Sequence, residues 1–137
     1  MKKIYFAGSI RGGRDDKDLY AEIIEKLKKY GEVLTEHLGD KTLSVMGEYV
    51  KKSDFIYNRD IEWLKTADIV VAEVTSPSLG VGYELAYAEK LNIPVVCLYR
   101  PSADKKLSAM IEGNKNFNIF EYQKVEELND IFTKLFK

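Results

Sequence analysis

The chain has 137 residues, a length typical of one domain that can bury a hydrophobic core without disulfides or bound metal. Its 21 Lys and Arg residues nearly balance 22 Asp and Glu residues. The resulting net charge of −1 argues against binding to duplex nucleic acid, which requires a basic face. One cysteine, Cys97, and one histidine, His37, exclude an internal disulfide and argue against a structural zinc site. We therefore expect one globular domain over residues 1–137.

No segment of the sequence predicts export or membrane insertion. The N-terminus has two lysines, but only a few apolar residues precede Arg11, which is too short a run for a signal peptide. The longest apolar runs are far below the roughly 20 residues needed to cross a bilayer. We expect a cytoplasmic protein.

Short apolar runs alternate with amphipathic stretches along the chain. The pattern predicts strand 3–7, helix 15–30, strand 32–36, helix 53–66, strand 68–74, helix 80–91, strand 94–99, strand 118–122 and helix 125–136. Gly31 is interpreted as the C-cap of the first helix, and Ser53 or Asp54 as the cap of the second. Residues 39–52 show no pattern and are interpreted as a loop, and Cys97 is interpreted as a buried core thiol.

This order of strands and helices predicts a doubly wound α/β fold of the flavodoxin or Rossmann type. Five parallel strands would form the sheet, with helices on both faces and right-handed crossovers. Ligands of such folds bind beyond the carboxyl ends of the strands, where the strand order reverses. The segments that follow the strands are therefore the places to look for a site.

The first strand is followed by the glycine-rich segment 8–14, GSIRGGR. Glycines allow backbone N–H groups to converge on an anion, while Arg11 and Ser9 can add a guanidinium and a hydroxyl. The segment matches neither the P-loop nor the dinucleotide-binding motif. It predicts an anion site, and the alternative is an ordinary turn with a surface arginine.

Glu84 is the only charged residue between Glu73 and Glu89, and its neighbours at helical spacing are uncharged. A carboxylate in apolar surroundings is costly to desolvate, and the nearby helix N-terminus would help to keep it ionised, as a nucleophile requires. Ser78 is interpreted as the N-cap of this helix. The alternative for Glu84 is a capping carboxylate that accepts a backbone N–H.

Asp60 also lies on an apolar helical stripe, and the alternative for it is a surface acid that pairs with Arg59 or Lys65. Two such carboxylates suggest cleavage of a glycosidic bond, in which one attacks the anomeric carbon and the other handles protons. His37 follows the second strand near the expected cleft, but a lone histidine is more often structural, and we leave it out of the catalytic set. Taken alone, Ser108 is an ordinary helix-start serine.

Several strings occur in order along the chain and together carry a resemblance. They are YFAGSIRGGR (5–14), VLTEH (33–37), DIEWL (60–64), ADIVVAEV (67–74), PSLGVGYEL (77–85), CLYRP (97–101) and LSAMI (107–111). In combination they resemble the 2′-deoxynucleoside 5′-monophosphate N-glycosidase (N-hydrolase) family, a branch of the nucleoside 2-deoxyribosyltransferase superfamily. The resemblance covers most of the chain up to about residue 113.

The resemblance implies a homodimer that needs no cofactor and hydrolyses deoxynucleoside monophosphates to free base and 2-deoxyribose 5-phosphate. Glu84 would be the nucleophile that forms a deoxyribosyl-enzyme ester, Asp60 would assist proton transfer and water activation, and Tyr5 would orient Glu84. The implied phosphate ligands are Ser9, Arg11, Gly12, Gly13, Ser78, Gly80 and, from the neighbouring subunit, Ser108. Ile10 would border the base and sugar.

Three alternatives remain open at this point. The chain could be a transferase that moves deoxyribose between bases, although the anion-binding character of segment 8–14 argues against an unphosphorylated substrate. It could be an N-glycosidase of ribonucleotides such as cytidine monophosphate. It could also be a nucleotide-binding module without turnover, in which Glu84 only caps its helix.

Overall fold

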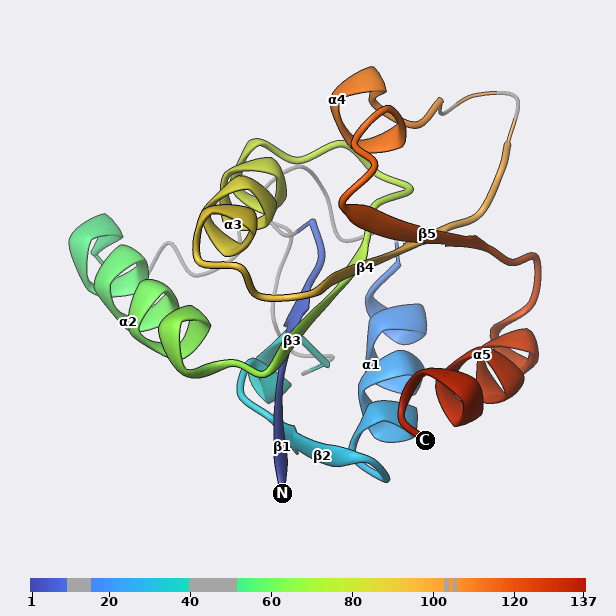
Figure 1. Ribbon diagram of the computed structural model, residues 1–137, viewed down its shortest axis with the longest axis horizontal. Helices are drawn as coiled ribbons and strands as arrows, with labels where there is room; N and C mark the ends of the chain where they lie inside the picture. Colours follow the sequence, from blue (N-terminus) through green and yellow to red (C-terminus); the bar gives the residue numbers. More distant parts are fainter. Residues whose placement is uncertain (10–15, 40–51, 103, 105) are drawn as a thin grey trace.

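A computed structural model describes residues 1–9, 16–39, 52–102, 104 and 106–137 (Figure 1). In chain order the elements are β1 (Lys2–Ala7), α1 (Lys17–Leu27), β2 (Gly31–Val33), the 3-10 helix η1 (Glu36–Gly39), α2 (Ser53–Thr66), β3 (Ile69–Glu73), α3 (Leu79–Lys90), β4 (Val95–Tyr99), α4 (Ala109–Glu112), β5 (Phe117–Glu121), the 3-10 helix η2 (Val125–Glu127) and α5 (Leu128–Leu135). Most of the predicted loop 39–52, together with residues 10–15, falls outside the described residues.

The described strands form one parallel sheet in the order β2-β1-β3-β4-β5. Ile4 is paired with Ile69, so β1 and β3 lie side by side although the chain first runs outward to β2. The direction of winding reverses between β1 and β3, which is the point where doubly wound sheets bind ligands. The predicted α/β fold with a five-stranded parallel sheet is confirmed.

Alternation along the strands divides the core into two halves. Phe6 and Val71 pack with α1 and α5, whereas Tyr5 and Val70 pack with α2 and α3 on the opposite face. Figure 1 shows the two pairs of helices on either side of the sheet. All five residues of β3 are buried, as expected for a strand covered on both faces. Because of this alternation, side chains at the carboxyl ends of the strands point alternately toward α1 and α5 or toward α2 and α3.

Some predicted boundaries and caps are wrong. Gly31 is not the C-cap of the first helix, which is Lys28; Gly31 begins β2 instead. A Cβ atom at Gly31 would lie 2.4 Å from the Lys2 carbonyl oxygen, so the close approach of β2 to β1 requires glycine. Neither Ser53 nor Asp54 is the N-cap of α2, which is Lys52.

Other differences concern short elements. The predicted strand 32–36 ends at Val33 because the chain turns into η1 at Glu36. The predicted helix 125–136 consists of η2 followed by α5. Only the start of α4 was predicted; there the Ser108 hydroxyl accepts from the Met110 N–H at 3.2 Å. Cys97 is fully buried, as predicted, and burial raises the pKa of its thiol to about 12. Among the described helices, none combines the length and the apolar character of a membrane span.

Candidate active site

A cavity of about 870 Å³ lies at the carboxyl ends of β1 and β3, between α2 and α3. Its lining residues come from four parts of the chain: Tyr5, Gly8, Thr35, His37, Leu38, Ser53, Ile56, Tyr57, Asp60, Ile61, Pro77, Ser78, Leu79, Gly80, Val81, Tyr83 and Glu84. The cavity therefore occupies the position that the strand order indicates for a ligand. Its volume is in the range of pockets that hold small-molecule ligands.

Glu84 lies in the second turn of α3 and is half-buried at the cavity. The helix begins where the Ser78 hydroxyl accepts from the Val81 N–H at 3.2 Å, so Ser78 is the N-cap, as predicted. The Glu84 carboxylate instead accepts a short hydrogen bond from the Tyr5 hydroxyl. Tyr5 reaches it because alternation along β1 turns this buried side chain toward α3. Glu84 therefore does not act as the capping residue of its helix.

The pKa of Glu84 is raised to about 7. Burial is the main cause; the Tyr5 hydrogen bond lowers the pKa, and the negative charge of Asp60 raises it. The expected effect of the helix N-terminus, which would favour the ionised form, is thus outweighed by desolvation. Burial and the neighbouring Glu84 and Asp60 charges also raise the pKa of Tyr5, so its hydroxyl stays protonated and donates.

Asp60 lines the same cavity from α2, and its side chain is 24% exposed. It accepts from the Arg59 Nε at 2.9 Å, so the interpretation of Asp60 as an ion-pair partner of Arg59 is correct. It also lines the cavity that contains Glu84, so the ion pair with Arg59 does not remove Asp60 from that cavity. The Arg59 guanidinium lies 4.9 Å from the centre of the Trp63 ring, a distance typical of a cation–π contact.

The implied phosphate ligands are only partly within the described residues. Ser78 and Gly80 line the cavity, next to Gly8. Ser9 is fully buried; its N–H donates to the Tyr20 hydroxyl at 3.1 Å, and its own hydroxyl has no hydrogen-bond partner among the described residues. Ile10, Arg11, Gly12 and Gly13 lie outside the described residues.

Ser108 does not line this cavity. It lies at the start of α4, in an adjoining pocket of about 570 Å³ whose lining also includes Ser78, Leu79 and Val81. Within one chain, the structure therefore brings together Tyr5, Asp60, Ser78, Gly80 and Glu84 but leaves Ser108 on the far side of the β3–α3 connection.

Several residues that line the cavity were not predicted from the sequence. Tyr57 and Tyr83 lie at its edge with their hydroxyl oxygens 3.1 Å apart, and both are about half exposed. Tyr83 directly precedes Glu84, and Tyr57 lies one helical turn before Asp60. This proximity in the sequence could have indicated that both line the site. His37, which we excluded from the catalytic set, also lines the cavity, and its Nε2 is 3.4 Å from an Arg59 nitrogen.

Solved structures with the same fold include an N-glycosidase and a 2-desoxiribosyltransferase. The CMP N-glycosidase from Clostridium botulinum is 17% identical, with a TM-score of 0.69 over 98% of this chain and 99% of that chain. The 2-desoxiribosyltransferase from Leishmania mexicana is also 17% identical, with a TM-score of 0.59 over 98% of each chain. At this level of identity the comparison shows the shared fold.

Sequence relatives are much closer. A 5-hydroxymethyl-dUMP N-hydrolase from Tetraodon nigroviridis is 54% identical over 119 residues, covering 86% of this chain and 84% of the relative. Proteins of the same name from Esox lucius and Homo sapiens are 50% and 48% identical, covering 98% and 90% of this chain and 95% and 73% of the relatives. The family model for nucleoside 2-deoxyribosyltransferase matches residues 4–119, which span β1 to β5. The chain belongs to the nucleoside 2-deoxyribosyltransferase family.

Proposed function

We propose that the protein hydrolyses the N-glycosidic bond of 2′-deoxynucleoside 5′-monophosphates to free base and 2-deoxyribose 5-phosphate. The observation that carries this proposal is the half-buried Glu84 carboxylate, which is held by Tyr5 in a cavity that also contains Asp60. The names of relatives about 50% identical to this chain support the same activity and make 5-hydroxymethyl-dUMP the first substrate to test.

In the proposed reaction a Glu84 oxygen attacks C1′ of the deoxyribose while the bond from C1′ to the base nitrogen breaks. Asp60 assists proton transfer to the departing base, and the product of this step is a deoxyribosyl ester of Glu84. Asp60 then assists deprotonation of a water molecule that attacks C1′ and releases the Glu84 carboxylate. Because the substrate lacks a 2′-hydroxyl, its oxocarbenium-like transition state is easier to reach.

Tyr5 contributes by orienting the nucleophile. Its hydrogen bond holds one Glu84 oxygen and lowers the Glu84 pKa against the larger effect of burial. At neutral pH a substantial fraction of Glu84 is therefore ionised and able to attack. Desolvation keeps that carboxylate reactive, because burial removes much of the water that would otherwise stabilise its charge.

The proposed phosphate site joins Ser9 to Ser78 and Gly80 at the cavity. The buried Ser9 hydroxyl, which has no partner among the described residues, supports this assignment because it has donor and acceptor capacity to offer a ligand. Arg11, Gly12 and Gly13 are expected to add a guanidinium and backbone N–H groups, and Ile10 to border the base and sugar. The phosphate would contribute binding energy far from the bond that breaks.

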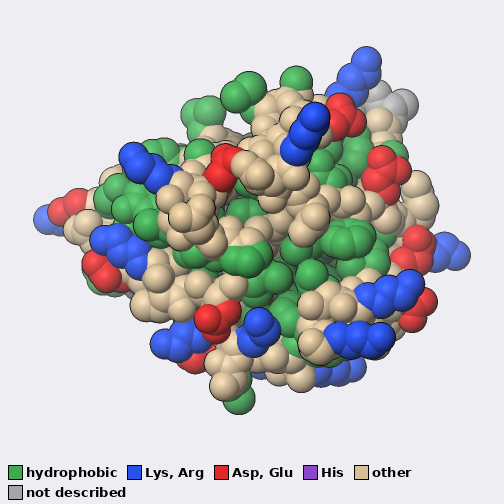
Figure 2. Space-filling model, in the orientation of Figure 1, with side chains coloured by type: hydrophobic (Ala, Val, Ile, Leu, Met, Phe, Trp, Pro, Cys, Tyr) green, Lys and Arg blue, Asp and Glu red, His purple; other side chains and the backbone are tan. Residues whose placement is uncertain are grey.

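Ser108 would reach the phosphate only from a second copy, so the proposed enzyme is a homodimer. Exposed apolar side chains beside it support this proposal: Leu79 is 98% exposed and Met110 is 82% exposed. Figure 2 shows hydrophobic side chains at the top of the view, over α4 and the start of α3. We expect Met110→Lys to yield a monomer by sedimentation velocity, with loss of activity; a dimeric, active variant would contradict this interface.

The decisive experiment is to incubate the protein with a panel of nucleoside and deoxynucleoside 5′-monophosphates and to measure released base by chromatography. We expect release from the deoxynucleoside monophosphates, with slower release from the matching ribonucleotides and unphosphorylated deoxynucleosides. Faster exchange with an added acceptor base than hydrolysis would indicate a transferase. Preferred cleavage of cytidine monophosphate would indicate a ribonucleotide N-glycosidase, and binding without any release would indicate a non-catalytic module.

A further inference from the structure

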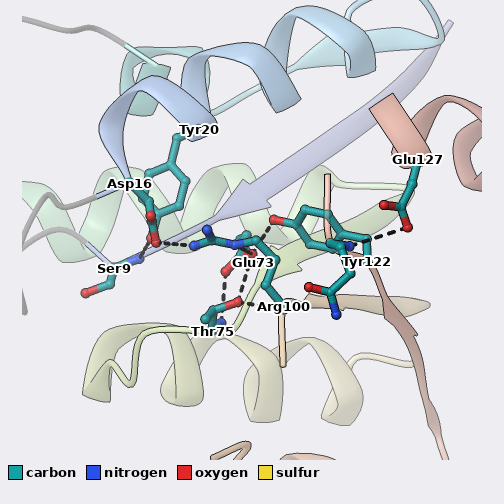
Figure 3. Close-up of polar contacts among 9 residues, drawn as sticks. Ser9, Asp16, Tyr20, Glu73, Thr75, Arg100, Tyr122 and Glu127 are labelled. Carbon is teal, nitrogen blue, oxygen red and sulfur yellow. Dashed lines mark hydrogen bonds and ion pairs between the residues drawn. The ribbon is translucent and has the colours of Figure 1, made fainter. Parts of the chain in front are cut away.

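A second group of polar side chains lies at the same edge of the sheet, but on the face covered by α1 and α5 (Figure 3). It consists of Asp16, Glu73, Thr75, Arg100 and Tyr122, which we call the Glu73 cluster. Asp16 directly precedes α1, and the other four lie at or just after the ends of β3, β4 and β5. None of them belongs to the proposed catalytic set.

Glu73 is the last residue of β3, and its side chain is fully buried. Its carboxylate accepts from the Thr75 N–H at 2.8 Å, from the Thr75 hydroxyl at 2.9 Å and from the Tyr122 hydroxyl at 2.5 Å. The Arg100 Nε lies 3.6 Å from the same carboxylate. A fully buried carboxylate is thus surrounded by donors and one cation.

Arg100 connects this carboxylate to the start of α1. Its Nη2 donates to the Asp16 carboxylate at 2.7 Å, and its backbone N–H donates to the Thr75 hydroxyl at 3.0 Å. Figure 3 shows the Arg100 side chain between Asp16 and Glu73. One guanidinium therefore fixes the connection after β3 relative to the residue that precedes α1.

These two anchored segments adjoin both described ends of the proposed phosphate site. Ser78 follows Thr75 by three residues, and Ser9 is held by Tyr20 on α1, the helix that begins just after Asp16. A buried ion pair adds little net stability compared with apolar packing, so its value here is better explained by the geometry that it imposes.

We propose that Arg100, held by Glu73 and Asp16, is a positioning residue that sets the separation of Ser9 and Ser78 and thereby the affinity for the 5′-phosphate. This inference rests on the proposed function. Arg100 acts through the segments it connects and does not itself touch the reacting atoms. It should therefore affect substrate binding far more than the chemical step.

The test compares Arg100→Gln, Arg100→Lys and Asp16→Asn with the wild-type protein on a deoxynucleoside 5′-monophosphate. For Arg100→Gln we expect KM to rise roughly tenfold while kcat stays within about twofold, because only the phosphate site is displaced. Arg100→Lys keeps the charge but cannot contact both carboxylates as a guanidinium does, so it should recover part of the loss. Asp16→Asn is isosteric and removes the charge of one partner of Arg100, so we expect a smaller rise in KM. This variant provides the test if Arg100→Gln folds poorly.

Glu25→Gln serves as the matched control, because it removes an exposed ion pair with Lys28 near the opposite end of α1 and should leave KM unchanged. Calorimetric titration with the same monophosphate gives Kd for each variant independently of turnover. Unchanged KM and Kd in both Arg100→Gln and Asp16→Asn would overturn the inference. So would equal losses in kcat and thermal stability without a change in KM. If the wild type binds the monophosphate but releases no base, the proposed function fails, while the Kd values still decide the role of Arg100.

Discussion

Glu73 and Glu84 lie at the same edge of the sheet, on opposite faces, and their surroundings differ in one important respect. Glu73 is fully buried and accepts three hydrogen bonds, with the Arg100 cation nearby. Glu84 faces a cavity, and among the described residues its carboxylate accepts a hydrogen bond from Tyr5 alone. A carboxylate whose hydrogen-bond donors all come from the protein is suited to fixing the positions of the segments that supply them. A desolvated carboxylate with few donors retains the capacity to react with a ligand.

The largest expected effect is on turnover. Glu84→Gln keeps the shape of the side chain but removes the nucleophilic oxygen charge, so we expect base release to fall by about a thousandfold or more. Calorimetric binding of the monophosphate should be retained. Glu62→Gln, which neutralises an exposed carboxylate on α2, is the control and should be fully active. Normal turnover in Glu84→Gln would remove Glu84 from the mechanism and end the contrast with Glu73.

The second effect is on the pH dependence of activity. Since the Glu84 pKa is about 7 and only the ionised form attacks, kcat/KM should fall as the pH is lowered through about 7. The Tyr5 hydrogen bond lowers that pKa, so Tyr5→Phe should move the acidic limb to higher pH. A pH–rate profile of both proteins tests this, and an acidic limb that stays in place would show that Tyr5 does not tune Glu84.

The third effect is on stability at Glu73. Glu73→Gln removes the charge that Arg100 faces and leaves one amide group that cannot accept all the existing donors. We expect the free energy of unfolding in urea to decrease by about 1–3 kcal/mol. A variant as stable as the wild type would show that the Glu73 cluster is not a structural requirement.

The smallest effect has the opposite sign and concerns Glu84. Its folded-state pKa lies above the ordinary value of 4.5, so the folded protein binds a proton that the unfolded chain has released between about pH 4.5 and 7. The contribution of Glu84 to stability therefore decreases as the pH rises through this window. At pH 8 we expect Glu84→Gln to increase the free energy of unfolding by about 1–2 kcal/mol. A decrease, measured in the same urea titration, would contradict the desolvation of Glu84.

Local patterns in the sequence were sufficient to predict the parallel sheet and the helix that carries Glu84. The continuous apolar run of β3 predicted a strand buried on both faces, and Ser78 predicted the start of α3. The length of β2 was overestimated, because the turn into η1 leaves no mark in the hydrophobic pattern. Gly31 allows β2 to approach β1 closely. The rule that glycine ends helices cannot distinguish this use of glycine from a helix C-cap.

The contacts that distinguish the two glutamates could not be predicted from local patterns. The partners of Glu73 include Arg100 and Tyr122, which approach it only after the sheet has formed. In the sequence, Glu73 was only a charge at the end of an apolar run. The link from Tyr5 to Glu84 was available from the family resemblance, whereas its electrostatic consequence, a raised pKa, depends on burial in three dimensions.

The pairing of β1 with β3 also affects when the protein can become functional during synthesis. Tyr5 and Glu84 are separated by 79 positions, so the first strand leaves the ribosome long before its partner helix exists. Until β3 has been synthesised, β1 can pair only with β2, and its other edge stays open to misassociation. The cavity therefore cannot form on a growing chain before α3 has been synthesised, and a truncated product that ends before α3 would have a nascent sheet but would lack Glu84.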